Sequence, residues 1–319
     1  MNDKELCGAP THEFLISQLA SHKVAVESMV QGELPTDLSQ LIDMYDELGQ
    51  TTSIAEACLV AAFNALDPRV GAGSTALPDQ YHDVKKQSFA LLSHTGHQFS
   101  RLAGPFAQLV HGGGGWSNQP VDVNGNILYR NTFKKNYTLT PEQRAQEYQN
   151  RVRKYLGGGG SFDAIVLLDA ENINTLVPWS HYDYVMLPNL ETRVYPTSRR
   201  ERRGKPKAGH SLLVGSNGNF DDRLVLSAGE MWILKDHADD IEAVVIASNS
   251  GHFKPDFRAL APACAGLEAI GIPRERIVMF GGPNNIQAVF REVAELHGVD
   301  GLKQRLPPDP VVLLEEWNA

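Results

Sequence analysis

Apolar residues recur at helical spacing through the first third of the chain. The pattern predicts helices over residues 12–30, 37–48, 53–66 and 83–110. Gly49 predicts the end of the second helix, because glycine favours the backbone conformation that closes a helix. Ser53 and Glu56 form a capping-box pattern that predicts the start of the third helix, and Pro105 predicts a kink or a restart in the last one. We therefore expect residues 1–111 to form a helical region.

A run of glycines at 112–115 separates this region from one with a different pattern. The Asn-Gly pair within residues 123–127 predicts a hairpin turn between extended segments. Thr140, followed by proline and then by Gln143, combines an N-cap with a capping box. This combination predicts a helix that runs to about Leu156.

Short apolar runs predict strands in most of the remaining chain. The predicted strands cover residues 164–168, 182–187, 210–214, 223–234, 241–248, 276–280 and 311–314. Helical spacing over 255–270, beginning at Pro255, and over 285–297 predicts a helix after each of two consecutive strands. Such a unit requires those strands to be parallel. The expected fold class is therefore α+β: a helical N-terminal region, then over residues 116–319 a mixed β-sheet domain that ends in a βαβα unit.

The composition is that of a globular protein, because 42% of the 319 residues are hydrophobic and 21% are charged. The net charge of −9 disfavours a nucleic-acid partner, since such binding relies on neutralising phosphates. No apolar run reaches the roughly 18 residues of a spanning helix, so we expect no membrane partner. Three widely separated cysteines favour a reducing compartment. With no secretory signal in view, we expect a cytoplasmic protein, or one delivered without a cleavable signal peptide.

Small and polar residues follow the predicted strand at 243–247 and precede the helix predicted to begin at Pro255. A helix N-terminus presents unpaired N–H groups and the positive end of a dipole. Together with the side chains of this loop, it would form a cradle for a phosphate or a carboxylate. The predicted ligand-binding residues here are Ser248, Asn249, Ser250, Gly251 and Lys254. The alternative is an ordinary capped helix start.

The next strand–helix junction repeats this arrangement with Gly281, Gly282 and Asn284. If the two strands are parallel neighbours, both loops lie at the sheet edge where open α/β sheets bind ligands. We therefore add these three residues to the predicted ligand site. The alternative is that they serve only as turn and cap residues.

Two histidines and a carboxylate lie near the predicted strand ends: His210, Glu230 and His252. One interpretation is acid–base catalysis by these three residues, with Ser211 as a ligand contact or a nucleophile. A second is a facial metal site, in which the same three residues hold Fe(II) or another divalent metal. In a third interpretation, these residues have only a structural role. The basic run at 199–207 precedes His210 and would either steer an anionic substrate or form a solvated loop.

Three segments of this domain resemble a known sequence pattern. Gly209-His210-Ser211, Ala228-Gly229-Glu230 and the segment 248–255, which reads SNSGHFKP, resemble HSSF…AGE…SNSSGHYKP. That pattern occurs in a loosely characterised set of bacterial proteins and in plant IQ-motif-containing calmodulin-binding proteins. The resemblance covers residues 205–285 and departs from the pattern at 211–215, where Ser-Leu-Leu-Val-Gly replaces the second serine and the aromatic residue. It implies that the three segments form one site, and it implies no particular reaction.

These observations predict an enzyme that binds a phosphate-bearing, nucleotide-like ligand and transfers or hydrolyses a group. The most concrete version is an NAD-consuming transferase of the ADP-ribosyltransferase kind, which a histidine on a strand and a glutamate would suit and which would act on a protein substrate. One alternative is a non-haem metal-dependent enzyme that uses two histidines and one carboxylate. The other alternative is a non-enzymatic module that binds a partner protein through its helical region.

Overall fold

The chain divides into a helical unit and a unit built around a sheet. The computed structural model describes residues 10–30, 33–66, 78–111, 120–130, 165–197, 209–214, 224–280 (apart from 237 and 256) and 308–317, together with some positions between 140 and 153. The helical unit comprises Met1–Phe106 and Gly282–Ala319, and the sheet unit comprises Ala107–Gly281. Of the chain after Gly281, the described residues 308–317 group with the helices.

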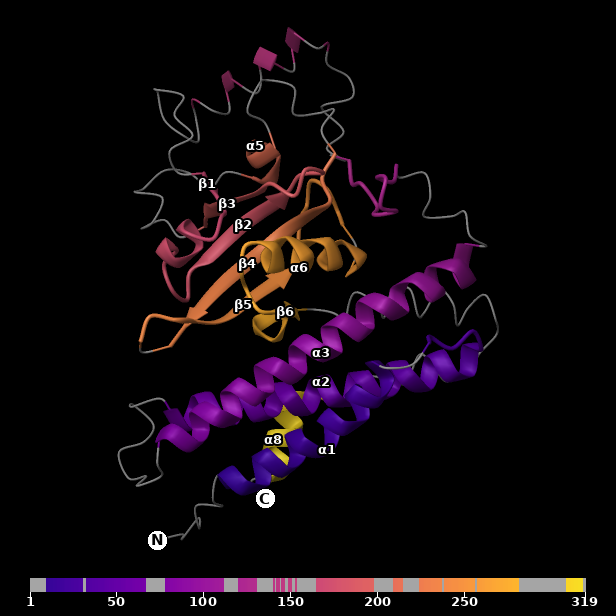
Figure 1. Ribbon diagram of the computed structural model, residues 1–319, viewed down its shortest axis with the longest axis vertical. Coiled ribbons are helices and arrows are strands. Elements are labelled where there is room, and N and C mark those ends of the chain that lie inside the picture. The colour runs from indigo at the N-terminus through magenta and orange to yellow at the C-terminus, as the bar shows by residue number, and fades with distance from the viewer. Residues whose placement is uncertain are drawn as a thin grey trace, which may run out of the picture. The chain divides into compact units, whose positions relative to one another are not determined.

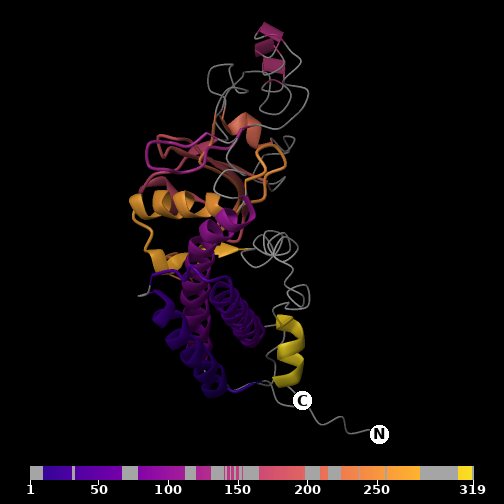
Figure 2. The same cartoon turned by 90° about the vertical axis from the view of Figure 1, so that its right-hand side faces the viewer.

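Among the described residues, four helices belong wholly or mostly to the helical unit: α1 (His12–Val30), α2 (Leu38–Leu66), α3 (Pro78–His111) and α8 (Pro310–Trp317). Both α1 and α8 pack against α2, and α8 is the yellow helix near the C-terminus in Figure 2. The core consists of apolar residues at helical spacing, among them Leu15, Leu19 and Leu48, which are almost fully buried. The predicted helical N-terminal region is therefore confirmed.

The predicted break between residues 48 and 53 is wrong, because α2 runs without interruption through both. The hydroxyl of Ser53 donates to the carbonyl of Gly49 at 3.1 Å, and that of Thr52 donates to the carbonyl of Leu48 at 2.8 Å. Hydroxyls bonded one turn back belong to a helix interior, so Ser53 does not act as a cap. In the same way, α3 continues across Pro105 without a restart.

Residues 311–314 were predicted as a strand and instead form part of the helix α8. Asp309 caps this helix, because its Oδ1 accepts a hydrogen bond from the backbone N–H of Val311 at 2.8 Å. Pro310 stands at the first helical position, where its missing N–H costs nothing. The cap therefore determines the conformation of a short apolar run that periodicity alone leaves ambiguous.

The second unit is built on a six-stranded sheet with the order β1-β3-β2-β4-β5-β6 (Figure 1). Its strands are β1 (Val166–Leu167), β2 (His181–Met186), β3 (Thr192–Pro196), β4 (Ser227–Lys235), β5 (Ile241–Ala247) and β6 (Ile277–Phe280). All neighbours pair antiparallel except β5 and β6, which are parallel and end level at Ala247 and Phe280. The mixed sheet and the α+β class are confirmed, whereas β3 was not predicted. The helix predicted over 285–297 lies outside the described residues.

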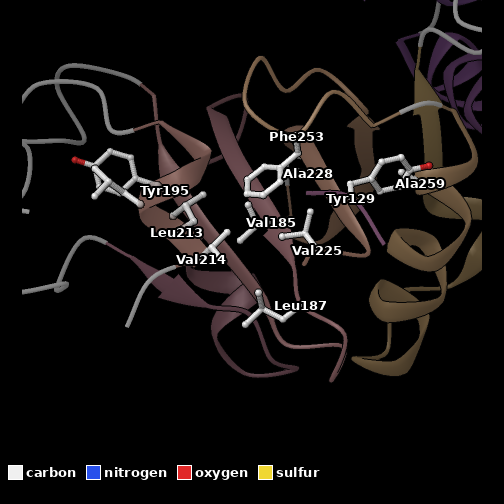
Figure 3. Close-up of a cluster of buried hydrophobic side chains, with 11 residues drawn as sticks. Tyr129, Val185, Leu187, Tyr195, Leu213, Val214, Val225, Ala228, Phe253 and Ala259 are labelled. Atoms are coloured by element: carbon white, nitrogen blue, oxygen red, sulfur yellow. The ribbon is translucent and has the colours of Figure 1, made fainter. Parts of the chain in front are cut away.

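The two faces of the sheet are covered by different helices. Val185 and Met186 are successive residues of β2 and so point to opposite faces. Met186 contacts the position of Gly266 in α6 (Leu260–Ala269), whereas Val185 belongs to a cluster with Leu213 of α5 (His210–Val214). Figure 3 shows that cluster, in which the ring of Phe253 lies against the side of the sheet that carries Val185.

Two predictions beside this sheet are wrong. Residues 210–214 form α5 and not a strand. A buried apolar run of five residues fits either a helix or a strand, and here the contacts with β2 and β3 determine that it is a helix. The helix predicted to begin at Pro255 begins later, with α6 at Leu260 after a 3-10 turn, η3 (Phe257–Ala259). Lys254 adopts a φ of 46°, outside the right-handed helical region, so the chain cannot enter a helix there.

Other local predictions are confirmed. Val121 and Ile127 bridge across the hairpin, and Gly125 adopts a φ of 81° at its turn. Thr140 and Gln143 form the reciprocal hydrogen bonds of a capping box. Short 3-10 turns, η2 (Asn172–Thr175) and η4 (Arg274–Arg276), precede β2 and β6. Within the described residues, no helix combines the length and the hydropathy that crossing a membrane requires.

Candidate functional site

Two carboxylates lie opposite each other on neighbouring strands of the sheet. Asp183 of β2 is the register partner of Glu230 of β4, so both side chains project from the same face. This is the face that carries Val185 and is covered by α5. The Asp183 side chain is fully buried, and the Glu230 side chain is 23% exposed. Of the two carboxylates, Glu230 is therefore the one within reach of a ligand.

His181 precedes Asp183 by two residues on β2 and so lies on the same face. Its ring stacks on that of Trp232, its register partner on β4, with the centroids 4.6 Å apart and an interplanar angle of 11°. Its Nε2 lies 3.3 Å from Oε1 of Glu230. The stacking fixes the imidazole in an orientation that directs this nitrogen at the carboxylate.

His210 approaches the same face from the first turn of α5. Its Nε2 forms a 2.8 Å hydrogen bond with the carbonyl oxygen of Gly229, the residue before Glu230. Because a carbonyl only accepts, this nitrogen must carry a proton. The same nitrogen lies 3.9 Å from Oδ1 of Asp183. His210 therefore acts here as a hydrogen-bond donor, and Nε2 offers no lone pair to a metal.

The loop after β5 supplies the third part of the site. Asn249 donates from Nδ2 to Oε2 of Glu230 at 3.3 Å. A Cβ on Gly229 would lie 1.7 Å from the carbonyl oxygen of Ala247, the last residue of β5. Only glycine at this position therefore lets β4 approach β5 so closely. The ring of half-buried His252 lies against Gly209, where a Cβ would be 2.7 Å from Cε1. The structure thus brings the segments around residues 210, 230 and 252 into one neighbourhood.

The remaining residues of the predicted ligand site differ in exposure. Ser211, Ser248 and Ser250 are buried, and the hydroxyl of Ser250 accepts a 3.4 Å hydrogen bond from the N–H of Phe253. Gly251 and Lys254 are exposed. Because α6 begins only at Leu260, the loop lacks the helix N-terminus on which the predicted anion cradle depended. Its remaining donors are side chains and turn backbone.

Other predicted residues lie outside the described part of the chain. These are Gly281, Gly282 and Asn284 of the second loop, and the basic run at 199–207. The described strands do support one premise of the two-loop prediction, because β5 and β6 are parallel neighbours that end at the same edge.

Sequence reasoning missed His181 and Asp183. The strand was predicted to begin at Tyr182, which excluded His181, and Asp183 was treated as part of an apolar run. A signal was present, because an acidic residue in the middle of a strand that is otherwise apolar or aromatic is costly to bury unless it is paired. A histidine two residues away on the same face strengthens that signal.

The ligating atoms of His181, Asp183 and Glu230 all lie within 4.8 Å of one another, which makes them a group able to hold a metal ion. This group, found within the described residues, differs from the predicted metal triad by replacing His210 and His252. On the opposite face, the hydroxyl of Tyr184 is hydrogen-bonded to Oγ of Ser227 at 2.8 Å, and burial raises the pKa of this tyrosine. Tyr184 therefore stays protonated and takes no part in the site.

No protein-family model, curated protein or solved structure matches this chain. The geometry of the site offers buried and half-buried carboxylates, two imidazoles beside them, and an adjoining loop with an exposed lysine, which together suit proton transfer on a bound ligand.

Proposed function

We propose that this protein is an enzyme that binds a small phosphate-bearing, nucleotide-like ligand and transfers or hydrolyses one of its groups by acid–base catalysis. The observation that carries the proposal is the pairing of Asp183 with Glu230 on a largely buried sheet face. Like charges directly opposite each other destabilise a sheet. A protein that keeps such a pair gains no stability from it, so a chemical role is the better explanation.

The residues take different roles in this proposal. Glu230, which is partly exposed, accepts the proton of the attacking water or hydroxyl group. Asn249 donates to Oε2 of Glu230, and the imidazole of His181 lies beside Oε1 at 3.3 Å. His210 donates to the backbone of Gly229 and so positions β4, while His252 contacts the ligand. The buried Asp183 acts through its neighbours and does not touch the ligand.

The phosphate-bearing ligand is supported by the loop beside Glu230. Lys254 is an exposed cation, and the buried hydroxyl of Ser248 has no hydrogen-bond partner among the described residues. A phosphate oxygen would accept hydrogen bonds from both groups. NAD is the concrete candidate: its ADP-ribose group would be transferred to a nucleophile of a protein substrate, whose proton passes to Glu230, and nicotinamide would leave. Among the described residues, Cys58 and Cys264 are buried and form no disulfide, which fits a reducing compartment such as the cytoplasm.

Ligand-dependent thermal unfolding tests the proposal. NAD, ATP and inorganic phosphate are added separately to the full-length protein and to the Lys254→Ala variant. A ligand at about a hundred times its Kd adds roughly 2.7 kcal/mol to the free energy of unfolding. We expect NAD or ATP to raise the melting temperature of the wild type more than that of the variant, and mass spectrometry to detect a cleaved product. Absence of both effects would contradict the proposed function.

A further inference from the structure

One histidine and two carboxylates on β2 and β4 are spaced as the ligands of one metal ion. The donor atoms of His181, Asp183 and Glu230 lie within 4.8 Å of one another. Metal–ligand bonds of about 2.0–2.2 Å hold ligand atoms roughly 3–3.5 Å apart. Nε2 of His181 and Oε1 of Glu230, at 3.3 Å, already have that separation. On binding an ion, the remaining donor atoms, which lie within 4.8 Å of one another, would close to the same separation.

The imidazole of His181 is directed at Glu230 at ion-pair distance but forms no hydrogen bond with it. Its Nε2 is inaccessible to solvent and forms no hydrogen bond within the described residues, although Oε1 of Glu230 is 3.3 Å away. A neutral imidazole nitrogen and a carboxylate oxygen both offer lone pairs. Two such atoms that face each other without a hydrogen bond are arranged as they would be around a shared cation. The stacked ring of Trp232 keeps the imidazole in this orientation before an ion arrives.

The charge at this place also favours a cation. Asp183 is fully buried and lies opposite Glu230, so two carboxyl groups share a region from which water is largely excluded. Two carboxylates this close to each other repel when both are ionised, and a divalent ion between them would neutralise both at once. We propose that His181, Asp183 and Glu230 hold one divalent transition-metal ion on this face of the sheet.

Neighbouring groups are placed to orient these ligands. Asn249 donates to Oε2 of Glu230, which leaves Oε1 directed at His181. The protonated Nε2 of His210 lies 3.9 Å from Oδ1 of Asp183. Groups of this kind, which hydrogen-bond or face the ligands, set ligand orientation in metal sites.

The ligand set also defines the class of ion. Imidazole suits zinc, iron and copper, whereas carboxylates suit manganese and magnesium, so a mixed set favours Zn²⁺, Mn²⁺ or Fe²⁺ over Ca²⁺ and Mg²⁺. Three protein ligands leave at least one position open for water or for a phosphate oxygen. This inference deepens the proposed function: Oε1 of Glu230 faces the ion, and Oε2, which accepts one hydrogen bond from Asn249, keeps a lone pair for the proton. It rests on the proposed function for the role of the ion, although not for the binding itself.

Calorimetric titration of the chelator-treated, full-length protein tests the site with Zn²⁺ and Mn²⁺, and with Mg²⁺ as the comparison. We expect one ion per chain, and tighter binding of Zn²⁺ or Mn²⁺ than of Mg²⁺. The central variant is His181→Phe, because phenylalanine keeps the ring stacked on Trp232 and removes the nitrogen. His181→Phe and Glu230→Gln should each weaken binding by at least about tenfold.

His252→Ala is the matched control, since it removes a nearby imidazole that is not part of the group, and it should keep the wild-type affinity. Circular dichroism establishes that each variant is folded. Failure of the wild type to bind, or equal affinity in the wild type and a folded His181→Phe, overturns the proposal. Metal binding without any response to NAD or ATP upholds the metal site and removes the proposed function. A response to NAD or ATP that is lost in Glu230→Gln, without metal binding, upholds the proposed function and overturns the metal site.

Discussion

Asp183 and Glu230 face each other across the β2–β4 ladder, one carboxylate fully buried and the other 23% exposed. Cross-strand partners of opposite charge would stabilise this position, and partners of like charge weaken it. The sheet therefore contains a local conflict at the place where His181, His210 and Asn249 converge. Conflicts of this kind are expected where a protein sacrifices stability for chemistry.

Removing one of the two charges should separate function from stability. We expect Glu230→Gln to lower turnover of the ligand that stabilises the wild type by at least about a hundredfold, the lower end of acid–base contributions. Its melting temperature should stay the same or rise, because the repulsion with Asp183 is relieved. Glu275→Gln, at an exposed position of η4, is the control and should change neither quantity. Full turnover with a lower melting temperature would instead make Glu230 a structural residue.

The close approach of β4 and β5 at the site should make Gly229 irreplaceable. A Cβ there would lie 1.7 Å from the carbonyl oxygen of Ala247 and 2.8 Å from its carbonyl carbon, and backbone atoms cannot rotate away as a side chain can. We expect Gly229→Ala to lower the free energy of unfolding by about 1–3 kcal/mol, as overpacked positions do.

Gly251→Ala is the matched comparison, because a Cβ at Gly251 has nothing within 4 Å. Its free energy of unfolding should stay within about 0.5 kcal/mol of the wild type. Urea denaturation of the three proteins measures both effects. Equal midpoints for Gly229→Ala and Gly251→Ala would show that the strands can separate without cost.

His252 and Gly209 should be coupled. The imidazole fills the space where a Cβ at Gly209 would come within 2.7 Å of its Cε1, so Gly209→Ala must displace the ring. If His252 contacts the ligand, His252→Ala should lower turnover by at least about a hundredfold, and Gly209→Ala should lower it by a smaller factor. The two changes together should cost little more than His252→Ala alone. Fully additive losses would mean that the two residues act separately.

The helical unit should respond to pH through Glu56. Burial, with a further contribution from the negative charge of Asp309, raises the pKa of Glu56 from 4.5 to about 6. The folded protein thus keeps this proton up to about pH 6, whereas the unfolded chain releases it near pH 4.5. The free energy of unfolding should therefore fall as the pH rises through this interval and remain lower above it, by about 2 kcal/mol.

Glu56→Gln removes this titration. The variant should be more stable than the wild type at pH 7, and the difference should disappear below about pH 4.5. Thermal unfolding of both proteins between pH 4 and pH 7 measures this difference in stability. Glu275→Gln is the control for the loss of one surface charge. A stability difference that does not vary with pH would exclude a perturbed carboxyl group at this position.

Local signals in the sequence predicted the elements whose conformation their own neighbours determine. The capping box at Thr140, the hairpin turn at Gly125 and the strands β4, β5 and β6 all follow from residues a few positions apart. The same reasoning misassigned 210–214 and 311–314. An apolar run of four or five residues fits either a helix or a strand, and a cap or a distant contact decides.

The candidate site likewise has one part that the sequence predicts and another that only the tertiary structure decides. The sequence by itself determined that His210, Glu230 and His252 belong to one region that contains the sheet. Only the tertiary structure decided which side chains meet, because the β2–β4 register places Asp183 opposite Glu230 and His181 opposite Trp232. Strand pairing joins residues far apart in the chain through backbone hydrogen bonds that all residue types except proline can make. The sequence on either side of a strand therefore does not specify its partner, and the packing of the whole sheet does.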